Sequence, residues 1–355
     1  MKKIAVITGS SGLIGSESVK FFVKKGYLVL GIDNDMRKYF FGDEGSTKSS
    51  KEKLIQTLET DYIHFDLDIR NYSALEEIFK TYESNIKIVI HTAAQPSHDW
   101  ASKEPITDFS INAVGTLNLL ELTRLFCPES TFIFTSTNKV YGDRPNLLNF
   151  SELDLRYENI IDGQLSKGVD ESMSIDNSKH SIFGASKVAA DIMCQEYGKY
   201  FGMNVGVFRG GCLTGPNHSG THLHGFLSYL IKCIILDINY TIKGYNGKQV
   251  RDNIHSLDLV KAFWFFHNSP KKGVVYNIGG GRENSTSILE VIKKVENNIG
   301  RVWTKYSFDN EPRIGDHQWY ITDNSKFKND YPDWDIEISL DEIINQIIQN
   351  YKKNY

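Results

Sequence analysis

Three glycines that follow the first apolar run constrain the fold of this chain more than any other feature. The run Ile4–Thr8 leads into Gly9, Gly12 and Gly15, and a segment with helical periodicity, Ser16–Lys25, follows at once. Glycines at this spacing permit a tight turn and close packing of a helix on a strand, and they let a pyrophosphate reach the unpaired N–H groups of the helix N-terminus. The segment therefore predicts the first β–α turn of a dinucleotide-binding fold.

Short apolar runs and segments with helical periodicity alternate along much of the chain. The runs typical of buried strands are Ile4–Thr8, Leu28–Asp33, Tyr62–Asp66, Ile86–Thr92, Thr131–Ser136, Val205–Arg209 and Val274–Ile278. The segments Ser16–Lys25, Tyr72–Tyr82 and Ala113–Phe126 carry apolar residues at helical spacing. Such alternation builds a parallel sheet covered by helices on both faces, so we expect a doubly wound α/β fold.

The alternation weakens after Arg209, where Gly, Pro, Asn and His become frequent. We expect a Rossmann domain over residues 1–205, with contributions from about 250–281 because Val274–Ile278 has the composition of a further buried strand. Residues 206–355 are expected to form a smaller, mixed α/β lobe that binds the substrate.

Composition argues against several classes of protein. The net charge is −4, with 40 basic and 44 acidic residues mixed along the chain, which gives no footprint for nucleic acid or an anionic membrane. No stretch approaches the roughly 18 apolar residues of a membrane span, and the first apolar run is too short for a signal peptide. The four cysteines form no metal or disulfide pattern. We expect a cytoplasmic protein with a small-molecule ligand.

Polar and small residues at the predicted strand ends complete the dinucleotide site. Asp33 ends the second strand, at the separation expected for the carboxylate that binds the adenosine ribose, and its charge repels a 2′-phosphate. NAD is therefore the predicted cofactor, although Arg37 nearby would tolerate NADP. Asp68 follows the third strand, and the small residues Ala93 and Ala94 follow the fourth, where the backbone can approach a cofactor.

Two further segments carry a family resemblance. The run Thr135–Gly142 reads Thr-Ser-Thr-Asn-Lys-Val-Tyr-Gly, and His180–Lys187 reads His-Ser-Ile-Phe-Gly-Ala-Ser-Lys. Together with the glycine turn, they resemble the extended short-chain dehydrogenase/reductases, in particular the NAD-dependent nucleotide-sugar epimerase/dehydratase family, over essentially the whole chain. A narrower similarity, to the CDP-sugar 2-epimerases, involves Ser136–Asp143, the insertion Asp154–Ser172, Asn246–Asp252 and Asn277–Gly280. The resemblance implies an enzyme that binds NAD and a nucleotide sugar and forms a homodimer.

Individual site residues follow from the motifs and from this resemblance. Candidate cofactor contacts are Gly9, Ser11, Gly12, Leu13, Ile14, Asp33, Asn34, Arg37, Asp68, Ile69, Ala93, Ala94, Gln95, Asn112, Thr135, Ser136, Lys187 and Arg209. Candidate substrate contacts are Thr137, Asn138, Gly211, Asn217, Lys248, Arg251 and Arg313, the cations among them being suited to a pyrophosphate. His218, His222 and His224 do not predict a metal site, because no carboxylate or thiol at ligand spacing accompanies them.

Phe183 departs from the family pattern at the catalytic position. The resemblance places a Tyr four residues before Lys187, where its phenol would move a hydroxyl proton during hydride transfer, and it matches Thr137 to the catalytic Ser/Thr. A phenyl ring carries no such proton, and general acid–base assistance contributes about 10²- to 10⁴-fold.

Three interpretations of Phe183 stay open. Another group carries the proton, or the residue is a change introduced to trap a complex, or the protein binds a nucleotide sugar without turning it over. Groups that could carry the proton through Thr137 are His98, which we prefer because it follows the fourth strand, and Asp99, Tyr157, Glu171, His180 or a water. Lys187 could itself act as a base if it is desolvated.

The expected function is therefore an NAD-dependent epimerase of a nucleotide-activated sugar, in particular a CDP-sugar 2-epimerase that uses transient oxidation by tightly bound NAD+. A 4-epimerase, dehydratase or reductase on the same scaffold is the alternative enzyme. Asn138 and Lys139 stand where a dehydratase would carry an acidic pair, which argues against that activity. A catalytically impaired nucleotide-sugar-binding protein is the alternative from another class.

Overall fold

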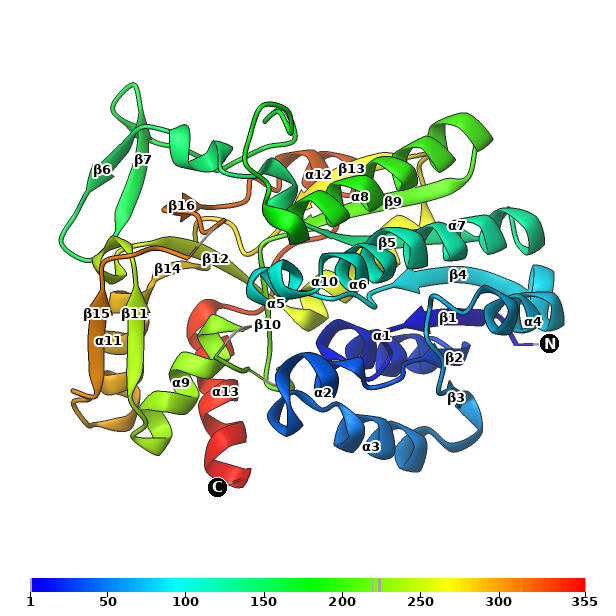
Figure 1. Cartoon of the computed structure of the whole chain (residues 1–355), viewed down its shortest axis with the longest axis horizontal. Helices are drawn as coiled ribbons and strands as arrows, with labels where there is room; N and C mark the ends of the chain where they lie inside the picture. Colours follow the sequence, from blue (N-terminus) through cyan, green and yellow to red (C-terminus); the bar gives the residue numbers. More distant parts are fainter. Residues whose placement is uncertain (1, 219, 223–224, 314, 355) are drawn as a thin grey trace. The chain divides into compact units, whose positions relative to one another are not determined.

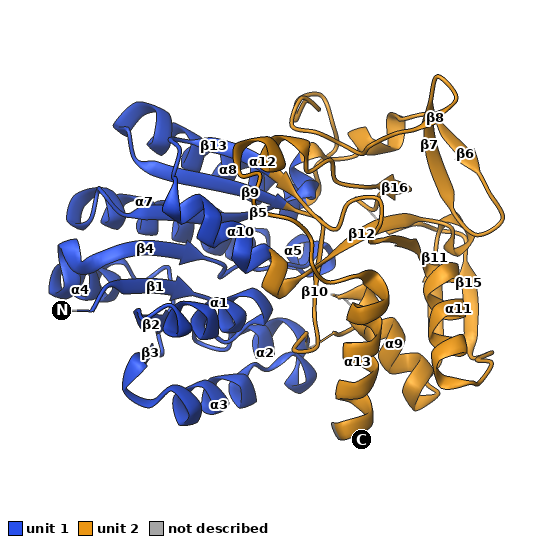
Figure 2. Cartoon of the chain, turned by 180° about the vertical axis from the view of Figure 1, so that it is seen from behind, with its two compact units in different colours: residues 1–140, 182–209, 259–276 blue, residues 141–181, 210–258, 277–355 orange. Residues whose placement is uncertain are grey.

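The computed structural model describes residues 2–218, 220–222, 225–313 and 315–354, which form two compact units (Figure 2). The first unit comprises Met1–Val140, Ile182–Arg209 and Leu259–Tyr276. The second comprises Tyr141–Ser181, Gly210–Asp258 and Asn277–Tyr355. Each unit is thus assembled from three separate stretches of the chain.

A seven-stranded sheet with the order β13-β9-β5-β4-β1-β2-β3 organises the first unit (Figure 1). The strands are β1 (Ile4–Thr8), β2 (Leu28–Ile32), β3 (Tyr62–Phe65), β4 (Ile86–His91), β5 (Thr131–Thr137), β9 (Asn204–Gly210) and β13 (Val274–Ile278). Strand β1 is parallel to β2 and β4, and the pairs β2–β3 and β4–β5 are parallel as well. The predicted doubly wound sheet is confirmed, and Val274–Ile278 does join it. The strand order reverses at β1, and ligands of such folds bind beyond the carboxyl ends of the strands at that point.

Helices cover this sheet, and the chain direction sorts them between its faces. They are α1 (Leu13–Lys24), α2 (Met36–Phe41), α3 (Lys48–Leu58), α4 (Tyr72–Tyr82), α5 (His98–Lys103), α6 (Pro105–Phe109), α7 (Gly115–Phe126), α8 (Ser181–Phe201) and α10 (Ser256–Asn268). Right-handed crossovers put α1 and α3 on one face and α4, α7 and α8 on the other. Phe22 of α1 meets Trp264 of α10, and Tyr197 of α8 donates to Glu121 of α7, so neighbouring helices also contact one another.

Short helical turns fill the connections in both units. The 3-10 turns are Asp43–Gly45, Glu59–Asp61, Glu83–Asn85, Asn138–Tyr141, Arg144–Leu147 and Tyr245–Gly247. A π-helical turn, η4 (Ser110–Val114), joins α6 to α7. Such turns are rare and frequently occur at functional sites.

The second unit combines small sheets with a helical core. Its strands are β6 (Phe150–Glu152), β7 (Tyr157–Ile161), β8 (Gln164–Leu165), β10 (Cys212–Thr214), β11 (Tyr240–Lys243), β12 (Val250–His255), β14 (Ser285–Ser287), β15 (Tyr306–Asp309) and β16 (Trp319–Tyr320). Its helices are α9 (Phe226–Leu236), α11 (Ile288–Ile299), α12 (Ser325–Asp330) and α13 (Leu340–Asn354). The buried apolar faces of α9, α11 and α13 pack together around Trp303. Within the described ranges, no helix combines the length and the apolarity that a membrane crossing requires.

Candidate active site

The glycine turn after β1 has the shape that a bound pyrophosphate needs. Gly9 has a φ of 65°, and a Cβ there would lie 2.8 Å from the backbone nitrogen of Ala93. A Cβ on Gly15 would lie 2.0 Å from the carbonyl oxygen of Gly9, so helix α1 can approach the turn only with glycine at this position. No side chain caps α1, whose N-cap is Gly12, and the buried hydroxyl of Ser11 has no hydrogen-bond partner among the described residues. These donors fit the anionic part of a dinucleotide.

Asp33 is held rigidly at the end of β2. Its two carboxylate oxygens accept the backbone N–H groups of Ser11 at 3.0 Å and Asp35 at 2.8 Å. Burial raises the pKa of Asp33, and these two hydrogen bonds oppose that rise. The Nε of Arg37 donates to the carbonyl of Gly45 at 3.2 Å. The carboxylate is thus fixed in the orientation from which it would bind ribose hydroxyls.

The neighbouring candidates bind one another at the ends of β2 and β3. The side-chain amide of Asn34 donates to Asp68 at 3.3 Å, and Asp68 also pairs with Arg70 at 2.6 Å. Ile69 is buried and packs into the core, where a Cβ on Gly115 would lie 2.5 Å from its Cδ1. The loop on this edge is therefore ordered by its own polar contacts.

Gln95 and Asn112 are buried and bind each other rather than lying open. The backbone N–H of Gln95 donates to Oδ1 of Asn112 at 3.0 Å, and Nδ2 of Asn112 donates to the carbonyl of Gln95 at 3.1 Å. Both side chains also donate to Asp108, on α6. Sequence reasoning missed Asp108, although its place four residues before Asn112 is the spacing of side chains that meet on one helix face.

The end of β5 carries Thr135, Ser136 and Thr137. The hydroxyl of Thr135 donates to the carbonyl of His91 at 2.8 Å, and the hydroxyl of Ser136 donates to the carboxylate of Asp191. The hydroxyl oxygen of Thr137 accepts the backbone N–H of Lys139 at 3.2 Å and donates weakly to Asn138 at 3.5 Å. Because β5 lies between β4 and β9 and these hydrogen bonds hold its end, the Thr137 hydroxyl has a defined position.

Lys187 is a buried cation on α8. Its Nζ donates to the carbonyl of Thr135 at 2.8 Å and lies 4.2 Å from the centroid of the Phe134 ring. Burial lowers the pKa of Lys187 to about 8, and the charges of Asp191 and Asp108 oppose the decrease. The ammonium group can therefore exchange a proton near neutral pH.

Phe183 lies one helical turn before Lys187 and contacts His98. The two rings meet edge to face with centroids 4.9 Å apart at an interplanar angle of 66°, and Phe183 is 6% exposed. His98 begins α5, and the hydroxyl of Ser97 accepts the backbone N–H of Trp100 at 3.3 Å. An imidazole thus contacts the ring that stands in place of the expected phenol.

Arg209 and the other predicted cations already bind carboxylates or carbonyls of the protein. Arg209 forms a two-point ion pair with buried Asp191, with distances of 3.0 and 2.9 Å. Sequence reasoning missed Asp191, since a core aspartate on a helix has no local signature. In the second unit Lys248 pairs with Glu152 at 2.7 Å, Arg251 pairs with Asp316, and Arg313 donates to the carbonyl of His222 at 3.0 Å.

The remaining predicted substrate contacts, Asn138, Asn217 and Gly211, differ in their surroundings. Asn138 is buried at the end of β5, whereas Asn217 is exposed. A Cβ on Gly211 would lie 2.7 Å from a carboxylate oxygen of the buried Asp252. His224 lies outside the described residues, among which no three His, Cys, Asp or Glu side chains group as metal ligands would.

The alternative proton carriers are divided between the two units. Asp99 follows His98 on α5 in the first unit, which also contains Thr137 and Lys187. Tyr157, Glu171 and His180 belong to the second unit. Within that unit Glu171 accepts the backbone N–H of Asn277 at 2.6 Å, and burial raises the pKa of Glu171.

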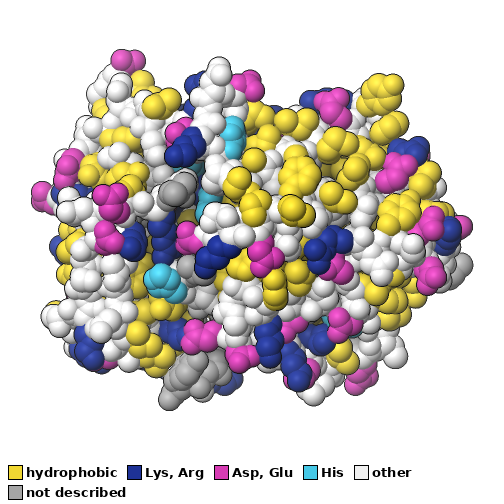
Figure 3. Space-filling model, viewed as in Figure 1, with side chains coloured by type: hydrophobic (Ala, Val, Ile, Leu, Met, Phe, Trp, Pro, Cys, Tyr) yellow, Lys and Arg dark blue, Asp and Glu magenta, His cyan; other side chains and the backbone are white. Residues whose placement is uncertain are grey.

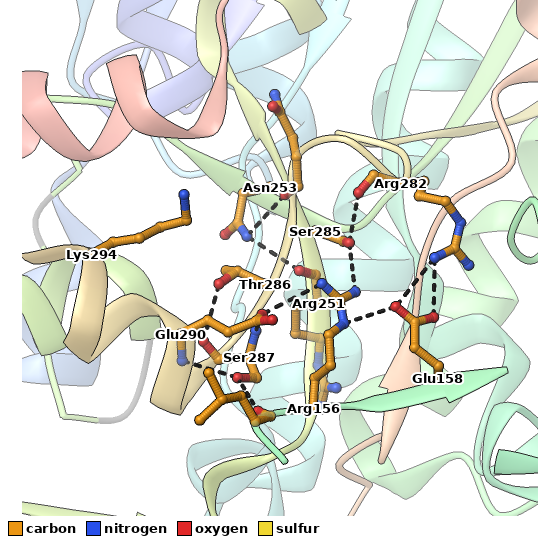
Figure 4. A network of polar contacts seen from close by, with 12 residues as sticks. Arg156, Glu158, Arg251, Asn253, Arg282, Ser285, Thr286, Ser287, Glu290 and Lys294 are labelled. Atoms are coloured by element: carbon orange, nitrogen blue, oxygen red, sulfur yellow. Dashed lines mark hydrogen bonds and ion pairs between the residues drawn. The ribbon is translucent and has the colours of Figure 1, made fainter. Parts of the chain in front are cut away.

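An arginine–glutamate network anchors the insertion that contains β6, β7 and β8 (Figure 4). Arg156 pairs with Glu158 at 2.8 Å and with Glu290 of α11 at 3.4 Å. Glu158 is buried and also pairs with Arg282 at 3.0 Å, which ties β7 to the segment that leads into β14. The sequence predicted the insertion but not this anchor, because its charged residues come from segments more than a hundred residues apart.

Comparison with known proteins identifies relatives of the whole chain. A family model described as "NAD dependent epimerase/dehydratase family" matches residues 5–279. CDP-paratose 2-epimerase from Salmonella typhi is 32% identical over 342 residues, which cover 94% of this chain and 95% of the relative. A protein described as a putative UDP-glucose 4-epimerase, from Methanocaldococcus jannaschii, is 27% identical over 98% of both chains.

Solved structures share the fold over nearly the whole length. UDP-glucuronic acid 4-epimerase from Bacillus cereus, in complex with UDP-glucuronic acid and NAD, has a TM-score of 0.79 and 24% identity and covers 99% of this chain and 100% of its own. UDP-glucose 4-epimerase from Thermus thermophilus, in complex with NAD, has a TM-score of 0.79 and 21% identity with the same coverage. The shared fold therefore includes segments of both compact units.

Proposed function

Because the chain belongs to the NAD-dependent epimerase/dehydratase family, we propose that it is an NAD-dependent nucleotide-sugar epimerase and, more narrowly, a CDP-sugar 2-epimerase. The observation that carries the narrower assignment is the 32% identity to CDP-paratose 2-epimerase over 94% of this chain and 95% of that protein. Two relatives described as 4-epimerases match at 27% identity over 98% of the chain, so inversion at carbon 4 is the second candidate.

The first unit supplies the residues that would hold the cofactor. The turn containing Gly9 and Gly12 and the N-terminus of α1 would bind the pyrophosphate, and Asp33 would bind the adenosine ribose hydroxyls. Lys187 would contact the nicotinamide ribose as the family resemblance implies. When bound, NAD supplies a reversible hydride acceptor for one carbon of the sugar.

We propose that His98 accepts and returns the proton of the sugar hydroxyl, and that the hydroxyl of Thr137 orients the sugar. Phe183 has no proton to give, whereas the imidazole of His98 lies against its ring and has an intrinsic affinity for protons that suits neutral pH. Lys187 stays cationic below its pKa of about 8 and so stabilises negative charge that develops on the sugar oxygen.

Incubation with CDP-, UDP-, GDP- and dTDP-sugars in D₂O, read by NMR, tests the assignment. We expect inversion at carbon 2 of a CDP-sugar without deuterium at the inverted carbon, because the hydride returns from the cofactor. Deuterium at that carbon would indicate proton abstraction from carbon and overturn the mechanism. Inversion at carbon 4 would establish the second candidate. Release of NAD on denaturation with no turnover of any sugar would establish a binding protein instead.

We also propose that the protein forms a homodimer through α6, α7 and α8. Large apolar side chains on these helices are exposed, among them Ile106, Phe109, Leu117, Ile192 and Tyr200, of which Ile106 is 86% and Tyr200 is 82% exposed. Figure 3 shows hydrophobic side chains gathered over the part of the first unit where α7 and α8 lie. Helices that together present apolar side chains suit a second copy of the same surface.

Light scattering of Leu117→Asp tests the homodimer. A charge on the helical face should give the mass of one chain, and the matched change Ile161→Asp, at an exposed apolar residue of β7, should leave the dimer intact. A parent protein with the mass of a single chain at micromolar concentration would refute the proposal.

A further inference from the structure

A fully buried carboxylate, Asp108, lies between the two segments that carry the proposed catalytic groups. Its Oδ1 accepts Nε2 of Gln95 at 2.7 Å and Nδ2 of Asn112 at 3.1 Å. Asp108 lies in the last turn of α6, just before the π-helical turn Ser110–Val114, and its four-residue separation from Asn112 places both side chains on one helix face. A buried carboxylate that accepts two amides is costly to remove, because both donors then lose their partner.

The Gln95 amide connects Asp108 to His98. The side chain of Gln95 forms two hydrogen bonds with the backbone of Ser97. Its Nε2 donates to the Ser97 carbonyl at 2.8 Å, and its Oε1 accepts the Ser97 backbone N–H. Ser97 is in turn the N-cap of α5, so the conformation of its peptide decides where the helix begins and where its first side chain, His98, lies. The carboxylate of Asp108 thus fixes the turn that presents the imidazole.

The Asn112 amide connects Asp108 to α8. Its Nδ2 shares its hydrogens among Asp108, the carbonyl of Gln95 and the hydroxyl of Ser186, the last at 3.1 Å. The hydroxyl of Ser186 donates to the carbonyl of Phe183 at 3.0 Å, and Ser186 precedes Lys187. The same carboxylate therefore also fixes the first turns of the helix that carries Phe183 and Lys187.

We propose that Asp108 is a positioning residue that holds the His98 turn and the start of α8 in register. Its meaning for catalysis rests on the proposed function, whereas its structural part does not. The relative position of these two segments matters more here than in a protein with tyrosine at residue 183, because the proposed proton carrier and Lys187 lie on different segments. A displacement of about 1 Å between reacting groups is enough to cost about 10²-fold in rate.

Two substitutions of Asp108 separate its acceptor oxygen from its charge. Asp108→Asn keeps an oxygen that accepts both amides, whereas Asp108→Ala removes it. We expect Asp108→Ala to lose about 10²-fold in kcat with little change in the KM for the sugar, and Asp108→Asn to keep most of the activity. Asp258→Ala, which deletes a buried carboxylate of the second unit, is the control for general destabilisation.

Hydrogen exchange gives a readout that needs no turnover. Amide exchange in peptides covering 94–100 and 182–188 should accelerate in Asp108→Ala and stay at the parent rate in Asp108→Asn. Gln95→Met, which removes only one connection, should accelerate exchange in 94–100 and leave 182–188 unchanged. If Asp108→Ala fails to fold, Gln95→Met and Asp108→Asn still decide the outcome.

Parent rates of exchange in both peptides of a folded Asp108→Ala protein would overturn the positioning role. Equal impairment of Asp108→Asn and Asp108→Ala would show that charge matters rather than the acceptor, and would overturn it too. If no nucleotide sugar is turned over by the parent protein, the proposed function fails on that result, while the exchange data still decide the role of Asp108.

Discussion

Replacing His98 should impair turnover only while residue 183 lacks a hydroxyl. The imidazole contacts the Phe183 ring with centroids 4.9 Å apart, and Lys187 lies one turn further along α8. In the parent protein, His98→Ala should lower kcat by about 10²- to 10⁴-fold, the usual contribution of a general acid–base group. In a Phe183→Tyr protein the phenol lies near the Lys187 ammonium group, which favours its ionised form, so that His98→Ala should cost less than about tenfold.

The difference between the two losses is a coupling free energy. A tenfold change in rate corresponds to about 1.4 kcal/mol, so the cycle predicts coupling between His98 and residue 183 of about 1.5 to 4 kcal/mol. Packing alone accounts for less, since an edge-to-face aromatic pair contributes about 0.5–1.5 kcal/mol beyond its buried area. His98→Phe separates the two effects, because it keeps an aromatic edge against Phe183 but carries no proton.

The assay is single-turnover conversion of the nucleotide sugar by the four proteins of the cycle, with His98→Phe as the fifth. His98→Phe should be as slow as His98→Ala. Phe183→Tyr places a hydroxyl on a buried ring, and an unpaired hydroxyl costs about 1–3 kcal/mol, so each variant is first checked for folding by urea denaturation. Equal losses on replacing His98 in both backgrounds would refute the assignment. A gain of orders of magnitude in Phe183→Tyr alone would identify Phe183 as a disabling substitution.

Three further outcomes follow from ionisable groups that burial or hydrogen bonds hold in place. Burial lowers the pKa of His91 to about 3, so between pH 6.5 and about pH 3 the unfolded chain binds more protons than the folded protein. The free energy of unfolding should therefore fall by about 2 kcal/mol between pH 7 and pH 5. In His91→Gln this decrease should be smaller. The Asp33→Asn protein should retain about 10- to 100-fold less NAD, measured as the NAD that the purified protein releases on denaturation. An unchanged amount of NAD would exclude a contact between Asp33 and the ribose. Glu158→Ala leaves Arg156 and Arg282 without their shared partner and should expose residues 150–165 to limited proteolysis, while the same cleavage rate as the parent would contradict an anchoring role.

The sheet could be predicted from the sequence because its signals are local. Strands buried on both faces are continuous apolar runs, and Ile4–Thr8 and Val274–Ile278 have the predicted bounds. The position of Asp33 at the end of β2 could be predicted because it depends only on the local sequence of the strand. The glycine turn is similar, since the steric demand at Gly15 comes from Gly9 only a few residues away.

The polar interior could not be predicted, because its partners are distant in sequence. Asp108 interacts with Ser186, and Asn112 hydrogen-bonds to both of them, although Asn112 and Ser186 are 74 residues apart. Arg209 is a predicted cofactor contact, and the structure adds an ion pair with Asp191 that no local pattern signals.

The order of the sheet has a consequence for how the protein is made. Strand β5 lies between β4 and β9, and β13 lies beyond β9, so a nascent chain that has emerged only as far as Val140 exposes the backbone edge of β5. The run Phe132–Phe134 on that edge is wholly buried in the finished protein. Until β9 leaves the ribosome, this edge is a template for pairing with other chains. Truncated versions of the first unit should therefore aggregate, and expression of that unit alone requires a gene that rejoins all three of its stretches.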